Sequence, residues 1–238
     1  MVTPAPTSSS ALVSGSVTTK LPASSGSSAL DAVKTIAAGQ SFDGGMVAYD
    51  RGVSCSGQDE GDDSDAVFEI EDGGSLSNVI IGPNQMEGVH CFGSCTLNNV
   101  WWSSVCEDAF TIKEQKDSET TTITGGGAFD ADDKVLQHNG GGTLHVSGFY
   151  VENFGKLYRS CGNCDDMPTR HVAIENLYAV KGSEIAGKFY PLGDILQRFL
   201  LTILRYQRQL WRHSYSARVD SLRCRRHLCS FQGQFERR

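Results

Sequence analysis

The chain has 238 residues, the length of one large domain or of one domain with tails. Its net charge of −7 hides a division: residues 1–187 carry −15 (ten Lys and Arg, twenty-five Asp and Glu), whereas residues 188–238 carry +8 (eleven and three). The acidic part argues against nucleic-acid binding, and the absence of an eighteen-residue apolar run argues against a membrane-spanning helix.

In chain order, residues 1–28 are rich in Ser, Thr, Pro and Ala, a composition that predicts a disordered linker. Residues 29–187 consist of short apolar runs broken by Gly, Asn and Asp, and we expect them to form the folded domain. Within it, DAVKTIAAGQSF (31–42) predicts one short helix that would cover the first end of the domain. Residues 188–238 form a basic tail of different composition.

A loose repeat runs through the acidic part. Its units begin at offsets of 21, 25, 22 and 27 residues, and each is a short β-branched strand followed by a turn; they start at Ser75, Thr96, Thr121, Thr143 and Arg170. Periods of 20–50 residues are typical of solenoids, and one short strand per unit without helices favours an all-β fold, a right-handed parallel β-helix. The alternative is an antiparallel β-sandwich, whose strands usually recur every 8–12 residues.

Four charged residues follow the same period, at spacings of 21, 26 and 22 residues: Glu87, Asp108, Lys134 and Lys156. Equivalent positions in successive β-helix turns stack about 4.8 Å apart, so these side chains would form a ladder about 14 Å long. Glu107 joins its acidic end, and Arg159 joins its basic end. The sequence therefore predicts a groove in which carboxylates give way to cations.

The two ends predict different chemistry. Carboxylates at Glu87, Glu107 and Asp108 suit a hard cation such as Ca²⁺, which takes oxygen ligands in loose geometry. The acidic run at 59–65 is instead interpreted as a solvated surface or a peripheral ion site. Clustered cations suit an acidic substrate, and they should lower the pKa of a lysine so that it can act as a general base.

Six of the eight cysteines lie in the acidic part, an even number that suits disulfides in an oxidising compartment. Six cysteines allow fifteen pairings, and Cys91 with Cys95 and Cys161 with Cys164 are close enough for local pairs. No signal peptide is visible, yet cysteine usage favours secretion. Of the adjacent residues Trp101 and Trp102, one is expected in the core, and the other could stack on a sugar.

Together these motifs resemble the pectate lyases of polysaccharide lyase family 3, small secreted β-helical enzymes. The resemblance runs from about Asp31 to Gly187 and rests on NVIIG (78–82), EGVHC (87–91), NVWW (99–102), VCEDAFTIK (105–113), GGGAFDADDKVLQHNG (125–140) and GKLYRSCGNC (155–164). It implies calcium-dependent β-elimination of polygalacturonate. It also implies an extracellular protein, which we expect to be monomeric.

The resemblance assigns roles position by position. Glu87, Glu107 and Asp108 look like calcium ligands, although position 87 is often Asp in the family. Lys113 resembles a substrate-binding lysine, while Lys156 and Arg159 match the pair that binds uronate carboxylates. Lys134 resembles the catalytic residue and is our predicted base; Arg159 is the second choice, because a guanidinium rarely loses its proton.

Two other functions stay open. A β-helical polygalacturonase would need a carboxylic acid to protonate the leaving group, which the basic end of the ladder lacks. The second open alternative is a solenoid that binds polysaccharide without catalysing a reaction.

The resemblance stops where glycine is lost and arginine increases, at residue 188. We interpret 188–238 as an aberrant continuation outside the family fold, with the β-helix truncated at its C-terminal end and its last edge exposed. The alternative is a basic amphipathic helix around 195–211 that lies on an anionic membrane.

Overall fold

The computed structural model describes residues 17–187, 215–225 and 228–237. Within these ranges, fifteen strands belong to one hydrogen-bonded sheet, and the only helix is a single 3-10 turn. The elements are β1 (Ser27–Ala29), β2 (Lys34–Ile36), β3 (Ser41–Asp50), η1 (Asp63–Asp65), β4 (Ala66–Glu71), β5 (Ser75–Ile81), β6 (Glu87–Phe92), β7 (Thr96–Trp102), β8 (Asp108–Glu114), β9 (Thr120–Thr124), β10 (Gly127–His138), β11 (Gly142–Ser147), β12 (Tyr150–Ser160), β13 (Arg170–Gly187), β14 (Tyr215–Arg225) and β15 (Leu228–Arg237).

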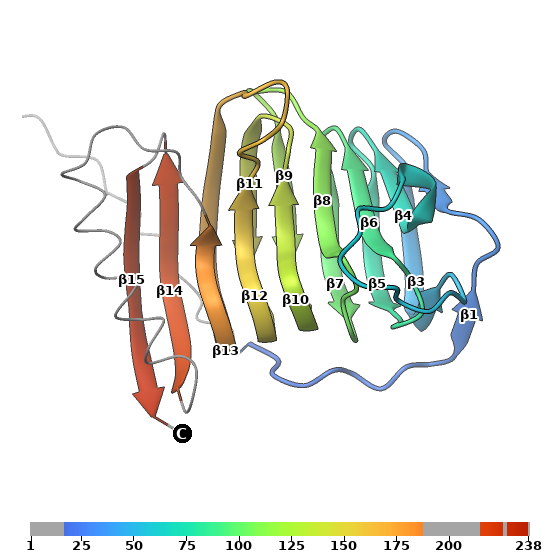
Figure 1. The fold of residues 1–238 in the computed structure, drawn as a ribbon, viewed down its shortest axis with the longest axis horizontal. Helices are drawn as coiled ribbons and strands as arrows, with labels where there is room; N and C mark the ends of the chain where they lie inside the picture. The colour runs from blue at the N-terminus through green and yellow to red at the C-terminus, as the bar shows by residue number, and fades with distance from the viewer. Residues whose placement is uncertain (1–16, 188–214, 226–227, 238) are drawn as a thin grey trace, which may run out of the picture.

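From β1 to β13 every strand pairs in parallel with its neighbours, so the strands stand side by side as successive turns of a coil (Figure 1). The predicted parallel β-helix is therefore confirmed. Strands β10, β12 and β13 are long because each bends and contributes to two stacks of strands. We call the stack of β4, β6, β8 and the C-terminal halves of β10 and β12 the site stack.

The repeat found in the sequence corresponds to the turns of this coil. Ser75 pairs with Thr96 as expected, but Thr96 pairs with Thr122, one residue beyond the predicted start of the next unit. Inside the coil, identical or similar apolar residues stack from turn to turn, and one such row contains Leu76, Leu97, Ile123, Val146 and Ile174, all of them fully buried. This continuous core explains why no single unit could fold alone.

Asparagine and aspartate form the corners at which the coil changes direction. Asn78, Asn99 and Asn176 have φ of 53°, 54° and 51°, a left-handed conformation that Asn tolerates better than most residues. Their side chains also pair between turns, since Asn99 Nδ2 donates to Asn78 Oδ1 at 2.9 Å. The polar residues that punctuate the repeat are thus needed for its geometry.

The helix predicted at 31–42 is wrong. Lys34–Ile36 forms β2, which pairs in parallel with β4, and Ile36 is buried opposite Ile70. The neighbouring β-branched residues Thr35 and Ile36 favour an extended strand, and pairing with β4 satisfies their backbone groups. The first turn of the coil is therefore covered by strands rather than by a helix.

At the N-terminal side, the described part of the predicted linker contacts the β-helix. Ser25 donates its backbone N–H to Met46 O at 2.9 Å, and Val17 packs against a cluster that contains Trp101. Trp101 and Trp102 are both buried, so neither is available to stack on a sugar, contrary to the expectation for one of them.

At the C-terminal side, β14 pairs antiparallel with residues 171–180 of β13, and β15 pairs with β14 (Figure 1). The edge of β13 that the sequence led us to expect exposed is therefore partly covered. The amphipathic helix considered at 195–211 lies outside the described residues, and the assignment of 188–238 to a tail stays a prediction. No described helix has the length and apolar character needed to cross a bilayer.

Candidate active site and metal site

The predicted ladder lies on the site stack in register. Asp108 pairs with Lys134 across β8 and β10, and Lys134 pairs with Lys156 across β10 and β12. Glu87 begins β6, two residues before Val89, which pairs with Phe110; this places Glu87 in step with Asp108. The four ladder residues, which span seventy positions of the chain, thus lie on consecutive turns of the β-helix.

A close approach of two strands brings the acidic end together. Gly88 follows Glu87, and a Cβ at this position would lie 2.2 Å from the backbone oxygen of Ala109. Only glycine permits that contact, so β6 and β8 can come near enough for Glu87 to reach the acidic pair Glu107 and Asp108. The sequence EGVHC therefore has a structural reason for its glycine.

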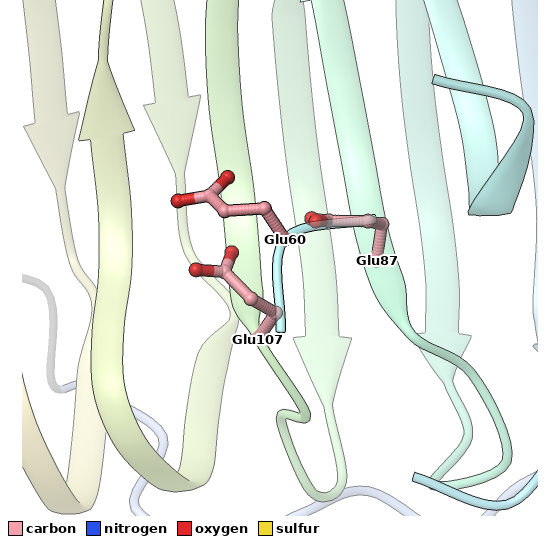
Figure 2. A group of neighbouring side chains, drawn as sticks. All are labelled: Glu60, Glu87 and Glu107. Atoms are coloured by element: carbon pink, nitrogen blue, oxygen red, sulfur yellow. The ribbon is translucent and has the colours of Figure 1, made fainter. Parts of the chain in front are cut away.

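The acidic run at 59–65 is mostly exposed, as its interpretation as a solvated surface predicted, but one of its residues, Glu60, reaches the carboxylates of the site. The run lies in the connection between β3 and β4, which includes η1, and this connection brings Glu60 to Glu87 at the start of β6. Oxygens of Glu60, Glu87 and Glu107 lie within 4.8 Å of one another, and Figure 2 shows the three side chains converging from different segments. Asp108, predicted as a ligand, is adjacent but outside this group.

A disulfide holds that loop in place. Residues 52–60 are all exposed and so have no buried anchor, but Cys55 is bonded to Cys106, the residue before Glu107. Gln58 Nε2 also donates to Cys106 O at 2.7 Å. Closing a loop of this length stabilises a fold by about 4 kcal/mol through the unfolded chain. The other two disulfides, Cys91–Cys95 and Cys161–Cys164, are the local pairs that we predicted.

The buried carboxylates fit a cation. Glu107 Oε2 and Asp108 Oδ1 are buried, and neither makes a hydrogen bond. Burial raises the pKa of Asp108 well above its usual range, and the neighbouring charge of Glu107 adds to this shift. Burial also raises the pKa of Glu107, against the opposing effect of Lys134. A divalent ion would supply the partner that these oxygens lack, and an all-oxygen donor set suits Ca²⁺.

Lys134 lies at the junction of the two ends. Its Nζ is 2.5 Å from Glu107 Oε1, 3.5 Å from Asp108 Oδ1 and 3.0 Å from Asp133 Oδ2. Burial alone would lower the pKa of Lys134, but Asp108 and Glu107 raise it above its ordinary value. The expected lowering of this pKa is therefore wrong, because the carboxylates around Lys134 outweigh the effect of its burial.

The other predicted cations, Lys113, Lys156 and Arg159, lie on the same stack, but they differ in the side chains that they contact. Lys113 Nζ lies 3.0 Å from Asp63 Oδ1, and Lys156 is bonded to Asp133. Arg159 instead donates to two neutral amides, Gln137 Oε1 at 3.3 Å and Asn163 Oδ1 at 2.9 Å. An incoming carboxylate would thus meet a guanidinium that donates to two uncharged amides.

Comparison with known proteins agrees with this geometry. The family model described as pectate lyase matches residues 18–206. The probable pectate lyase D of Emericella nidulans is 60% identical over 163 residues, which cover 68% of this chain and 61% of the relative. The chain belongs to the pectate lyase family. It spans about three fifths of the length of that relative.

Solved structures of the pectate lyase family share the fold. The catalytic domain of pectate lyase PelI from Erwinia chrysanthemi matches with a TM-score of 0.55 and 33% identity over 64% of this chain and 70% of the domain. A structure of the same PelI in complex with tetragalacturonic acid matches with a TM-score of 0.51 and 29% identity, over 67% of this chain and 56% of that one.

The charge cluster of this family member predicts a pH-dependent effect of calcium on stability. A carboxyl group with a raised pKa in the folded state binds its proton more tightly there, so its contribution to stability falls as pH rises from its unfolded pKa through the folded one. Glu107 and Asp108 behave in this way, and a bound cation would reverse the loss. We expect calcium to raise the melting temperature more at pH 8 than at pH 5.

The comparison must be made with and without calcium at each pH. Burial lowers the pKa of His138 to about 4, which makes stability rise with pH between about 4 and 6.5, opposite in sign to the carboxylates. His138 lies in the core against Tyr158 and Gly141 O, so its effect cancels in the calcium-dependent difference. Equal shifts at both pH values would contradict a cation site at Glu60, Glu87 and Glu107 beside Asp108.

Proposed function

We propose that the chain cleaves polygalacturonate by calcium-dependent β-elimination and gives 4,5-unsaturated oligogalacturonides. The observation that carries this proposal is the ladder itself, in which buried carboxylates that fit a cation lead directly to lysines and an arginine. Membership of the pectate lyase family supports it, as does the tetragalacturonic acid bound to the related PelI.

Glu60, Glu87 and Glu107 would hold the calcium ion, with Asp108 beside them. When bound, calcium would neutralise the carboxylate of a uronate and so make the neighbouring C5 proton more acidic. Glu87 is the first residue of β6, and Glu107 directly precedes the neighbouring strand β8. Glu60 instead comes from the disulfide-bonded loop. The rigid strands would fix two ligands, and the loop would complete the set.

Lys113, Lys156 and Arg159 would bind the uronate carboxylates. Lys113 is on β8, whereas Lys156 and Arg159 are on β12, with β10 between these two strands, so a chain of uronates could lie across the turns of the coil. Arg159 can accept a carboxylate in bidentate geometry by exchanging its amide partners. To bind a uronate, Lys113 must break its ion pair with Asp63, and Lys156 must break its ion pair with Asp133. Among the described residues Arg159 has no such ion pair to break, so we expect it to contribute most to binding of the substrate carboxylates.

Lys134 would remove the C5 proton, after which the C4–O bond breaks. Its position between the carboxylates and Lys156 places it at the centre of the ladder. To act as a base it must first lose its own proton, and the charges of Glu107 and Asp108 oppose that loss. Lys134 can therefore act as the base only when the charges of Glu107 and Asp108 are neutralised. Arg159 is the second choice, since a guanidinium holds its proton more firmly.

Asp133 is the carboxylate that contacts both Lys134 and Lys156 at the basic end, and it bears on the alternative of a polygalacturonase. Burial would raise its pKa, but hydrogen bonds from Lys156 and Lys134 outweigh burial and lower it. Asp133 is thus ionised at neutral pH and cannot protonate a leaving group. This favours elimination over hydrolysis, which requires a protonated acid.

We also propose that the protein works outside the cell. Three disulfides in the described residues suit an oxidising compartment, where they persist. The partner would be the pectate of plant cell walls. We keep the expectations of a monomer with no nucleic-acid or membrane partner.

Analysis of the reaction products tests the proposed function. The purified chain is incubated with polygalacturonate, and the fragments are examined by mass spectrometry for their new ends. Unsaturated non-reducing ends support elimination. Saturated ends on both new fragments would support a hydrolase, and binding without any cleavage would support a polysaccharide-binding solenoid.

A further inference from the structure

A buried histidine lies behind the candidate metal site without a role in the reaction described above. His90 is on β6, three residues after Glu87, and only 1% of its surface is exposed. It faces outward in the row of the site stack that pairs Glu69, His90 and Thr111. The loop that carries Glu60 and Asp63 covers it, so the ring lies between a strand and that loop.

The two ring nitrogens of His90 face two carboxylates from different segments. Nε2 lies 3.3 Å from Glu87 Oε2, within hydrogen-bond geometry. Nδ1 lies 3.5 Å from Asp63 Oδ1 and makes no hydrogen bond. A neutral imidazole has one N–H, and this geometry assigns it to Nε2 and thus to Glu87.

Both oxygens of Glu87 are then held by the protein. Oε1 accepts the backbone N–H of Gly61 at 3.1 Å, and Oε2 faces His90. Each carboxylate oxygen has a further lone pair, so Glu87 keeps the capacity to bind a cation while its orientation is fixed. Glu60, by contrast, is exposed, and the nearest cation to it in the described part of the chain is Lys134, whose Nζ lies 3.9 Å from Glu60 Oε1.

From this geometry we infer that His90 is a positioning residue of the calcium site: its Nε2–H donates to Glu87 and fixes the orientation of that ligand. Partners of this kind behind metal ligands typically change affinity 10–100-fold when they are removed. This inference rests on the proposed calcium site.

The test uses calcium binding measured by calorimetry on the folded, oxidised protein. His90→Ala should weaken calcium binding about 10–100-fold. His90→Gln places an amide N–H near the position of Nε2 and should recover most of the lost affinity. His145→Ala is the matched control, because His145 is a partly exposed histidine on β11, 3.9 Å from Glu175 and away from the site; its calcium affinity should be that of the unaltered protein.

The outcomes separate this inference from the proposed function. If the unaltered protein binds no calcium, the metal site itself is wrong. If it binds calcium and His90→Ala binds equally well, the positioning role of His90 is overturned. Equal weakening in the Ala and Gln variants, with unchanged calcium-free melting temperatures, would also overturn it, because the donor to Glu87 would then be irrelevant.

Discussion

Replacing Lys134 by alanine should abolish formation of the unsaturated product while binding of oligogalacturonate persists. A positioned general base contributes about 10²–10⁴-fold to a rate, so we expect turnover to fall by on the order of 10³-fold. Binding should survive because Lys113, Lys156 and Arg159 lie on other turns or strands of the site stack. The measurement is the ultraviolet absorbance of the new C4–C5 double bond, beside calorimetry with tetragalacturonate.

Two features make this variant informative. Removing Lys134 takes a cation away from Glu107 and Asp108, so calcium affinity should hold or rise, and a loss of activity cannot be ascribed to a lost ion. Lys116→Ala is the control, since Lys116 is 77% exposed and pairs with Glu119 outside the site. Normal turnover by Lys134→Ala would remove Lys134 from the mechanism and direct attention to Arg159.

Replacing Glu107 by glutamine should remove calcium binding and, with it, activity. Glu107 is buried, its Oε2 makes no hydrogen bond, and Glu60 and Glu87 lie close to it. Because calcium affinity depends steeply on the number of charged ligands, we expect a loss on the order of 100-fold or more. The calcium-induced rise in melting temperature should disappear at the same time.

The control for Glu107→Gln is Glu69→Gln. Glu69 lies on β4 of the same stack but bonds Thr35 rather than the cluster. It should bind calcium as the unaltered protein does. Full calcium affinity in Glu107→Gln would mean that the buried carboxylate serves only as the partner of Lys134.

The ladder could be predicted from the sequence because, in a β-helix, residues that recur once per turn of the coil lie next to one another in space. Once one turn requires 21–26 residues, Glu87, Asp108, Lys134 and Lys156 must meet, whatever lies between them. Local disulfides could also be anticipated, since short separations leave few geometries.

The contribution of the loop could not be predicted in this way, because a loop has no period. Glu60 and Asp63 reach the site through the Cys55–Cys106 disulfide, which joins residues 51 positions apart. A signal was present, since Cys55 and Cys106 were the two cysteines left without a local partner. Likewise, the pKa of Lys134 depends on carboxylates that include its sequence neighbour Asp133, and together these outweigh the effect of burial.

The most direct test of the central claim is the calcium dependence of product formation. The chain is incubated with polygalacturonate, and the absorbance of the C4–C5 double bond is followed before chelation, after addition of a calcium chelator, and after calcium is restored in excess. We predict that absorbance rises, stops on chelation and resumes with calcium. Unsaturated product that continues to form in the chelator, or new reducing ends without the absorbance, would contradict calcium-dependent elimination.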